Sequence, residues 1–433
     1  MTSPRRSGPS TPRGVGLGRR TTAAAAGLAA AALLAACSGA GSEPSPGPSS
    51  TAQGSPSSSP SPGPSSPGPS TTPTASATAT PEPTGSAESP DDVLAGWSLE
   101  QKVGQLLMVG VSVSDPAGVS AEAVRDKHVG NVFLHGRSTA GVDATRDLVD
   151  GYTALVSRRS THGTPLLVAT DQEGGLVQVL RGPGFSDIPA ATEQATWQPG
   201  TLEKRARGWG DELAAAGVNL NLAPVMDLVD EADAKDNPPI GYFDRSYGFT
   251  PRSVVRSANA FSAGQRAAGV EPVIKHFPGL GRVTANTDTD AEVTDDVTTR
   301  DDPSVRVFAR GIEAGAGFVM MSTAVYERID PDAPAAFSPV VVDGLLRDDL
   351  GFDGVVMTDD LSAAAQVQGW PPGERAVDAV DAGVDLVLAS ADPSVAPAMA
   401  DALVAEARKD PAFATKVDTS ARRVLAAKAA LAK

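Results

Sequence analysis

Two adjacent aspartates, Asp359 and Asp360, follow the apolar run "GVVM" after a single threonine, Thr358. A buried charge is costly unless it is paired, so stability alone does not explain a carboxylate at the end of a buried strand. Aspartate is also a favoured residue for capping a helix that follows. We therefore predict different roles for the two residues: Asp359 is reactive, and Asp360 is structural and caps the next helix.

Two further motifs carry groups that could hold a polar ligand. In "DQEGG", Asp171 could accept hydrogen bonds from a pair of vicinal hydroxyls, while the two glycines let the backbone turn beneath a ligand. The alternative for Asp171 is a tight turn in which it bonds backbone amides. In "GYFDRSYG", Arg245 could donate to a carbonyl or carboxylate of a bound molecule, or it could pair with Asp244 at the surface.

The stretch "KHFPGLGRVTANTDTD" opens with Lys275 and His276 side by side at the end of an apolar run. It holds several carboxylates and one histidine, so composition alone does not identify the group that moves a proton. The four histidines of the chain do not have the spacing of zinc ligands, and we expect neither a metal nor an organic cofactor. The chain also lacks the G-x-S-x-G motif of acyl-transfer nucleophiles and the Walker loop that binds phosphates.

Eight short apolar runs recur along the rest of the chain. They occupy residues 105–111, 129–135, 165–171, 218–224, 271–277, 317–323, 354–360 and 384–390. Continuous apolar runs, rather than alternating ones, are typical of strands buried on both faces of a parallel sheet. Amphipathic segments that end at glycine, such as 201–217, 251–269 and 301–317, indicate helices between the strands.

Eight such units predict an α/β fold, a single (β/α)8 TIM-type barrel over residues 91–433. A doubly wound open sheet is the alternative, but no G-x-G-x-x-G motif follows the first strand. The carboxyl ends of barrel strands share one rim, and active sites are built there. We therefore expect the polar residues after the third, fourth, fifth and seventh strands to converge, namely Asp171, Asp227, Lys275, His276, Asp359 and Asp360.

The first 36 residues have the features of an export signal. An arginine-rich leader precedes an Ala/Leu run that is short for a permanent transmembrane helix and ends in small residues before Cys37, the only cysteine. "LLAAC" resembles a lipobox, so we predict a lipoprotein signal peptide over residues 1–36 and a lipid on Cys37. A free thiol after an ordinary signal is the alternative, and Arg19 with Arg20 leaves the twin-arginine export route open.

Composition and charge limit the kinds of partner that we expect for this protein. Residues 37–90 are rich in Ser, Pro, Gly and Thr and offer too little apolar surface for a core, so we predict a disordered tether. The chain has 52 acidic and 36 basic residues, a formal net charge of −16, which argues against nucleic acid as a partner. We expect an extracytoplasmic monomer that is anchored to the cell membrane through the lipid on Cys37.

Seven motifs, in their order along the chain, resemble the catalytic domain of glycoside hydrolase family 3, in its β-N-acetylglucosaminidase branch. They are "SLEQKVGQLLMVG", "DQEGG", "NLNLAPVMDL", "FDRSYG", "KHFPG", "LLRDDLGFDGVVMTDDLS" and "DAGVDLVL". The resemblance runs from Asp91 to the C-terminus and implies a TIM-type barrel, a retaining mechanism and no metal. Motif by motif, it implies that Asp359 is the nucleophile. It also implies that Asp171, Arg245, Lys275 and His276 hold the hydroxyls and the N-acetyl group of the sugar.

The chain departs from the pattern of this family at the residues expected to act as general acid and base. Retention requires a second carboxyl-type function, about 5 Å from the nucleophile in most such enzymes, to protonate the leaving oxygen. In this branch the loop after "KHFPG" normally supplies an Asp-His dyad. Aligned without gaps, Leu280, Asn286 and Asp288 stand where the first histidine of the loop, the dyad aspartate and the catalytic histidine would be.

Three interpretations compete at this loop. Asp288 itself serves as general acid/base, with its pKa raised by burial or by Asp359; or Asp290 serves after a small shift of the loop; or catalysis is lost and the protein only binds sugar. We predict the first. An anionic Asp288 would also repel phosphate, which favours hydrolysis over phosphorolysis.

The predicted function is that of an exo-acting, retaining β-N-acetylglucosaminidase. It would hydrolyse terminal GlcNAc from peptidoglycan-derived saccharides or muropeptides. A catalytically impaired sugar-binding lipoprotein and a β-glucosidase-like member of the same family remain the alternatives.

Overall fold

The computed structural model describes residues 93–432. The predicted signal peptide over residues 1–36, the lipidated Cys37 and the tether over residues 37–90 therefore lie outside the described residues. Among residues 93–432, no helix is both long enough and apolar enough to cross a bilayer.

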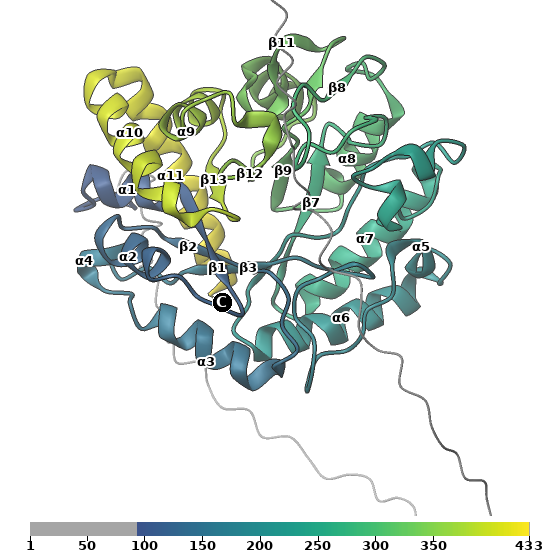
Figure 1. Cartoon of the computed structure of the whole chain (residues 1–433), viewed down its shortest axis with the longest axis horizontal. Coiled ribbons are helices and arrows are strands. Elements are labelled where there is room, and N and C mark those ends of the chain that lie inside the picture. Colours follow the sequence, from purple (N-terminus) through teal and green to yellow (C-terminus); the bar gives the residue numbers. More distant parts are fainter. Residues whose placement is uncertain (1–92, 433) are drawn as a thin grey trace, which may run out of the picture. The chain divides into compact units, whose positions relative to one another are not determined.

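Eight parallel strands close into a barrel, and helices surround it (Figure 1). The strands are β1 (Leu107–Ser112), β2 (Asn131–His135), β3 (Leu167–Thr170), β6 (Leu220–Asn221), β7 (Glu271–Phe277), β9 (Phe318–Met321), β12 (Val355–Asp360) and β13 (Leu386–Ala389). Neighbours in this order pair with each other, and β13 pairs with β1 to complete the ring. Each strand coincides with one of the eight predicted runs, so the predicted (β/α)8 barrel is confirmed.

The fourth strand is much shorter than its apolar run. The run covers residues 218–224, but β6 holds only Leu220–Asn221. Pro224 has no N–H to donate, so the regular ladder cannot continue through it. Its carbonyl still accepts from the Lys275 N–H at 3.3 Å, which keeps the chain beside β7 beyond the end of β6.

The helices follow the expected pattern between the strands. They are α1 (Leu99–Gln105), α2 (Gly118–Asp126), α3 (Gly141–Thr153), α4 (Arg158–Thr161), α5 (Ala191–Gln194), α6 (Pro199–Ala215), α7 (Pro251–Ala267), α8 (Pro303–Glu313), α9 (Pro372–Asp381), α10 (Ala396–Lys409) and α11 (Pro411–Leu431). The three amphipathic segments that we singled out form α6, α7 and α8. The glycines after them, Gly217, Gly269 and Gly315, have φ values of 83°, 80° and 87°, a conformation that ends a helix and that glycine adopts without strain.

Several smaller elements were not predicted. β4 (Gln172–Gly174) and β5 (Val177–Gln178) form a hairpin after β3. β8 (Thr294–Asp295), β10 (Val325–Tyr326) and β11 (Asp330–Pro334) form a second small sheet, and residues Val340–Asp349 after it form a π-helix. The five strands hold only two to five residues each, which is too few for a recognisable periodicity in the sequence.

Side chains on the barrel strands alternate between two cores. On β12, Val355 and Met357 belong to the cluster inside the barrel, while Val356 between them packs in the layer beneath the helices. The strands β3, β7, β9 and β13 alternate in the same way. On α11, Val424 joins the interior cluster and Leu431 packs against it, so this helix covers one end of the barrel interior.

Candidate active site

The alternation of the strands carries polar residues into the interior at their carboxyl ends. On β12 the inward-facing Met357 is followed two residues later by Asp359, which therefore also faces inward. On β7 the inward-facing Val273 is followed in the same way by Lys275. The same step leads from Ala169 to Asp171 just after β3. Three distant parts of the chain therefore place ionisable groups in one layer at the rim.

A cavity of about 420 Å³ lies at this rim. Its walls include all six residues that we predicted for catalysis and sugar binding: Asp171, Arg245, Lys275, His276, Asp288 and Asp359. Inward-facing apolar side chains, among them Phe133, Leu222, Met320 and Leu388, also line it and belong to the barrel interior or its upper layer. The cavity is thus continuous with the rim and is closed below by the packed barrel.

Lys275 and Arg245 are held on one side of this cavity by two carboxylates, the partly exposed Asp171 and the buried Glu173. Lys275 Nζ lies 2.6 Å from both Asp171 Oδ1 and Glu173 Oε1. Arg245 donates from Nε and Nη2 to the two oxygens of Glu173 at 2.9 and 2.8 Å, and from Nη1 to the Pro239 carbonyl at 2.8 Å. Such a bidentate pair fixes the plane of the guanidinium. Arg245 is therefore a buried part of the site and does not pair with Asp244 at the surface.

Charge pairing outweighs burial for Glu173 and Lys275. Burial alone would raise the pKa of Glu173, but Arg245 and Lys275 outweigh it and lower that pKa to about 2. Burial would lower the pKa of Lys275, but Asp171 and Glu173 outweigh it and raise that pKa. Glu173 consequently cannot supply a proton near neutral pH. The cluster offers fixed donors and acceptors, which suits binding of hydroxyl and amide groups.

His276 is oriented by a second buried carboxylate, Asp227. Asp227 Oδ2 lies 2.7 Å from His276 Nδ1, and its Oδ1 accepts from the backbone N–H groups of His276 and Leu280 at 3.1 and 2.8 Å. Arg245 Nη2 lies 3.4 Å from His276 Nε2. Because a guanidinium can only donate, this arrangement fits the tautomer in which Nδ1 carries the proton and bonds Asp227.

Asp360 is structural, but it does not cap a helix as we predicted. Its carboxylate accepts from the N–H groups of Ser362 (3.0 Å), Ala363 (3.0 Å) and Ser390 (2.8 Å) and from the Ser362 hydroxyl (2.6 Å). The residues that follow form a turn rather than an α-helix, so the cap serves that turn and ties it to the end of β13. Asp360 also lines the cavity, but both of its carboxylate oxygens accept from these donors, so Asp359 is the better candidate for a reactive carboxylate.

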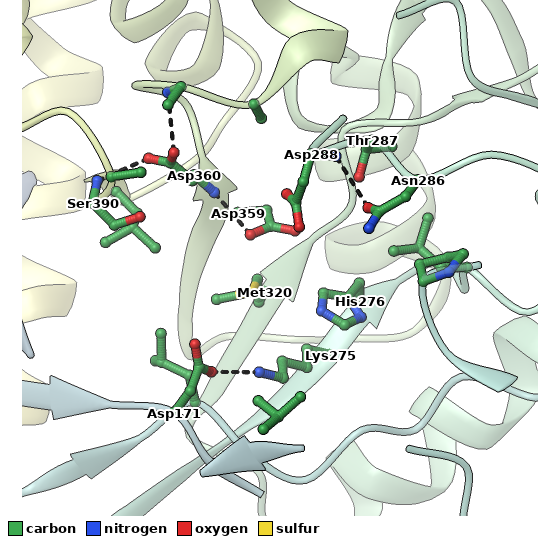
Figure 2. Close-up of a pocket in the computed structure, with 18 of the residues that line it drawn as sticks. Asp171, Lys275, His276, Asn286, Thr287, Asp288, Met320, Asp359, Asp360 and Ser390 are labelled. Carbon is green, nitrogen blue, oxygen red and sulfur yellow. Dashed lines mark hydrogen bonds and ion pairs between the residues drawn. The ribbon is translucent and has the colours of Figure 1, made fainter. Parts of the chain in front are cut away.

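Asp288 faces Asp359 across the cavity. The residue is exposed on its loop, yet its carboxyl group points into the cavity and toward the carboxyl group of Asp359 (Figure 2). Confinement of that group among protein atoms, and then the charge of Asp359, raise the pKa of Asp288 to about 6, against the opposing charge of Arg245. A carboxyl group with such a pKa can exist in both protonation states near neutral pH.

The turn around Asp288 leaves the other candidate, Asp290, outside the cavity. Asn286 Oδ1 accepts from the Asp288 N–H at 3.1 Å, as Figure 2 shows, and the Asn286 carbonyl accepts from the Asp290 N–H at 2.8 Å. The Asp290 carboxylate accepts from the Thr289 hydroxyl at 2.7 Å and is exposed. Only Asp288 of the two aspartates lines the cavity, so the structure favours the first of our three interpretations over the second.

Comparison with known proteins agrees with this geometry. Residues 98–427 match the glycosyl hydrolase family 3 N-terminal domain. This chain belongs to glycosyl hydrolase family 3. The match covers all eight barrel strands and the helices from α1 to most of α11, including each residue that lines the cavity.

Relatives in family 3 include enzymes named for hexosamine substrates. A β-hexosaminidase of Alkalilimnicola ehrlichii is 35% identical over 309 residues, which cover 68% of this chain and 82% of the relative. A β-N-acetylhexosaminidase of Beutenbergia cavernae has a crystal structure that matches with a TM-score of 0.76 and 64% identity, over 77% of this chain and 98% of that one. A family 3 β-N-acetylglucosaminidase of Paenibacillus sp. matches with a TM-score of 0.69 and 31% identity, over 78% of this chain and 63% of that one.

Two residues of this family 3 site, Glu173 and Asp227, were missing from the predicted set of site residues. Asp227 had been expected at the rim because it follows the fourth strand, but its bond to His276 was not foreseen. Glu173 lies two residues after Asp171 in "DQEGG", and an extended backbone sends both side chains the same way, toward Lys275. That spacing was the signal that could have identified it.

Proposed function

We propose that this protein is an exo-acting, retaining β-N-acetylglucosaminidase that removes terminal GlcNAc from peptidoglycan-derived saccharides or muropeptides. The observation that carries the proposal is the pair of facing carboxyl groups, Asp288 and Asp359 (Figure 2). The cavity that holds them is also lined by Lys275 and Arg245. Membership of family 3 and the hexosaminidase names of its relatives support the choice of sugar. The source of the substrate rests on the predicted export of the chain.

In the first half of the reaction, a carboxylate of Asp359 attacks C1 of the sugar. The bond from C1 to the leaving oxygen breaks, and that oxygen takes the proton of Asp288, so a glycosyl ester forms on Asp359. In the second half, the Asp288 carboxylate removes a proton from water, the resulting oxygen attacks C1, and the ester bond to Asp359 breaks. The pKa of about 6 lets Asp288 serve as acid and then as base.

The remaining walls of the cavity fit recognition of a terminal sugar. Asp171 and Lys275 form an acceptor and a donor side by side, which suits vicinal hydroxyls, and Arg245 with His276 suits the N-acetyl group and a neighbouring hydroxyl. Because the packed barrel interior closes the cavity below, only the end of a saccharide chain can enter it. This supports cleavage from the end of a chain.

The proposal is tested on the full-length protein with 4-nitrophenyl β-GlcNAc, 4-nitrophenyl β-glucoside and a GlcNAc-terminated peptidoglycan fragment. We expect turnover of the first and third and little of the second. Asp359→Ala should lower kcat by roughly three orders of magnitude or more. Asp288→Ala should keep activity on a substrate with a good leaving group, and azide should increase that activity because azide needs no base.

Each remaining result selects an alternative. If no GlcNAc substrate is turned over but GlcNAc still binds, the protein is a sugar-binding lipoprotein. Faster turnover of the glucoside than of the GlcNAc substrates would indicate that the protein is a β-glucosidase-like member of the family. Release of GlcNAc from aryl substrates but not from the peptidoglycan fragment would remove the peptidoglycan part of the proposal alone.

A further inference from the structure

The loop that carries Asp288 runs from the end of β7 to Val293, just before β8. Its first part is tied to the segment between β6 and α7, because Asn237 Nδ2 donates to the carbonyl oxygens of Leu280 at 2.8 Å and Val283 at 2.9 Å. Its last part continues into β8, which pairs with β10. Asp288 lies between these two anchors, on a stretch that neither of them fixes directly.

The middle of the loop is held by the segment that follows Asp359. The N–H of Ala365 donates to the carbonyl of Asp288, and the N–H of Gln366 donates to the carbonyl of Thr287, both at 3.1 Å. These bonds act on the residue that carries the acid and on its neighbour. The loop and the segment after β12 therefore form one continuous wall of the cavity.

The side chain of Gln366 adds two hydrogen bonds between the Asp288 loop and the segment after β12; we call this whole set of bonds the seam. Its Oε1 accepts from the Val293 N–H at 2.7 Å, and its Nε2 donates to the Val293 carbonyl at 3.2 Å. The amide pairs with both polar groups of one residue, as a neighbouring strand would. Gln366 is 6% exposed and Val293 is 3% exposed, so water does not readily replace these bonds. The Val293 carbonyl also accepts from the Val325 N–H at 3.1 Å, so loss of the Gln366 side chain would leave the buried Val293 N–H as the unpaired group, which favours opening of the loop.

We infer that Gln366 is a positioning residue, which clamps the Asp288 loop onto the segment that follows Asp359 and so fixes the separation of the two carboxyl groups. This inference rests on the proposed function, in which Asp288 protonates the leaving oxygen. Gln366 does not line the cavity and acts only through Asp288. In a retaining enzyme the spacing of the two groups is narrow, so a loop displaced outward loses acid catalysis before it loses sugar binding.

A leaving-group comparison separates this role from a general structural one. A 2,4-dinitrophenolate departs without a proton, whereas the sugar alkoxide released from a β-1,4-linked GlcNAc disaccharide needs one. Gln366→Ala should lower kcat/KM for the disaccharide by about tenfold to a hundredfold, part of what a general acid contributes, and for 2,4-dinitrophenyl β-GlcNAc by less than about threefold. The basic limb of its pH profile should also move to lower pH, because Asp288 leaves the vicinity of Asp359.

Gln368→Ala is the matched control in the same segment. The Gln368 amide donates to the carbonyls of Ser362 (3.2 Å) and Ala364 (3.1 Å) and accepts from Arg375 (3.0 Å). Its removal deletes amide hydrogen bonds near the seam but leaves the bonds to Thr287, Asp288 and Val293 in place. We expect equal effects of Gln368→Ala on the two substrates and no shift of the pH profile.

The measurements are made on the full-length protein, with Asp288→Ala as the reference for complete loss of the acid. The inference is overturned if Gln366→Ala lowers kcat/KM equally for both substrates, as Gln368→Ala is expected to do. This conclusion requires that Asp288→Ala, measured alongside, still loses more on the disaccharide than on the dinitrophenyl substrate. Absence of turnover by the unmutated protein would instead overturn the proposed function. If Gln366→Ala does not fold, Gln366→Glu is measured in its place. This variant still accepts from the Val293 N–H but no longer donates to the Val293 carbonyl, so we expect a smaller drop in kcat/KM that is again larger for the disaccharide than for the dinitrophenyl substrate. Equal values of the drop for the two substrates would overturn the inference.

Discussion

At the scale of single residues, the carboxyl groups of the cavity differ in the groups that lie beside them. Asp171 and Glu173 pair with Lys275 and Arg245, and these cations lower the pKa of Glu173 to about 2, so the two carboxylates act as fixed binding groups. Asp288 has no such cation bonded to it; confinement among protein atoms, and then the charge of Asp359, raise its pKa to about 6. The surroundings of a carboxyl group thus decide whether it serves binding or proton transfer.

The activity should fall as the pH rises through about 6, because Asp288 donates a proton only in its acid form. Its pKa of about 6 means that the acid form predominates below that pH and is lost above it. We expect kcat/KM for a GlcNAc disaccharide to decline with a midpoint near this pH, and 2,4-dinitrophenyl β-GlcNAc, whose leaving group needs no proton, to lack the decline. Initial rates across the acid and neutral range measure this. A decline that persists in Asp288→Asn would assign it to another group.

The same pKa shift makes Asp288 unfavourable for stability in its ionised form. A carboxyl group whose pKa is higher in the folded state binds more protons there than in the unfolded chain, so stability falls as the pH rises from the unfolded value of about 3.9 to the folded value. Asp288→Asn should therefore raise the unfolding temperature at pH 7 and have no such effect below about pH 4. Thermal unfolding at both pH values measures the difference. A change of the same size at both would argue against the shift.

The site residues that could be predicted from the sequence are those whose position depends on local pattern. Asp171, Lys275 and Asp359 stand at the ends of apolar runs, and strand alternation points them inward. The contacts of Glu173 could not be predicted, because its partner Arg245 is 72 residues away and meets it only once the barrel has closed. The sequence likewise located Asp288 by alignment, but its orientation toward Asp359 depends on a seam between two distant loops.

At the scale of elements, strands and loops differ in how far the sequence determines them. All eight barrel strands were predicted, because each is a buried apolar run between polar segments. The regular part of β6 was overestimated because a proline interrupts its ladder. The hairpin β4–β5 and the sheet of β8, β10 and β11 were missed, because such short strands are stabilised by neighbours from elsewhere in the chain.

The last helix, α11, carries a buried lysine that should make stability depend on pH. Lys428 Nζ donates to Gln105 Oε1 at 2.6 Å and to the Gly130 carbonyl at 2.8 Å, two uncharged oxygens. Burial lowers the pKa of Lys428 to about 7. The unfolded chain then binds more protons than the folded one between this pH and the ordinary pKa of about 10.4, so stability rises with pH across that window.

Lys428→Met should therefore stabilise the protein below pH 7, and the advantage should shrink as the pH rises toward 10. The effect can reach several kcal/mol, because one pKa unit corresponds to about 1.4 kcal/mol. Chemical denaturation at pH 6 and at pH 9 measures it. Lys416→Met on the same helix is the control, since Lys416 is exposed and pairs with Asp381 at 2.6 Å. A difference between the two variants that does not change with pH would contradict the prediction.

At the scale of the whole molecule, the described part of the chain contains every group that the site uses. The residues that line the cavity lie between Phe133 and Ala391. The barrel is completed by pairing of β13 with β1 and covered at one end by α11, all within residues 93–432. The part of the chain that matches family 3, residues 98–427, has nearly the same limits.

Removal of residues 1–90 should therefore leave catalysis unchanged. We expect kcat/KM for 4-nitrophenyl β-GlcNAc to stay within about twofold of the value for the full-length protein, because a domain with its own core folds alone. The unfolding temperature should likewise be the same. Steady-state kinetics and thermal unfolding of the two proteins measure this. A large loss of activity in the shortened protein would show that the first 90 residues contribute to the site.

Location should depend on Cys37 and not on the barrel. The proposed lipid on Cys37 is the only feature of the chain that we expect to hold the protein at the membrane, and a Ser residue at this position cannot form the thioether that carries it. In a bacterial host that lipidates exported proteins, the full-length protein should sediment with membranes, whereas Cys37→Ser should appear in the soluble fraction or the medium with the same kcat/KM. Incorporation of a labelled fatty acid into the protein but not into the variant gives an independent measurement. If the variant remains with the membrane to the same extent, a different attachment must be responsible.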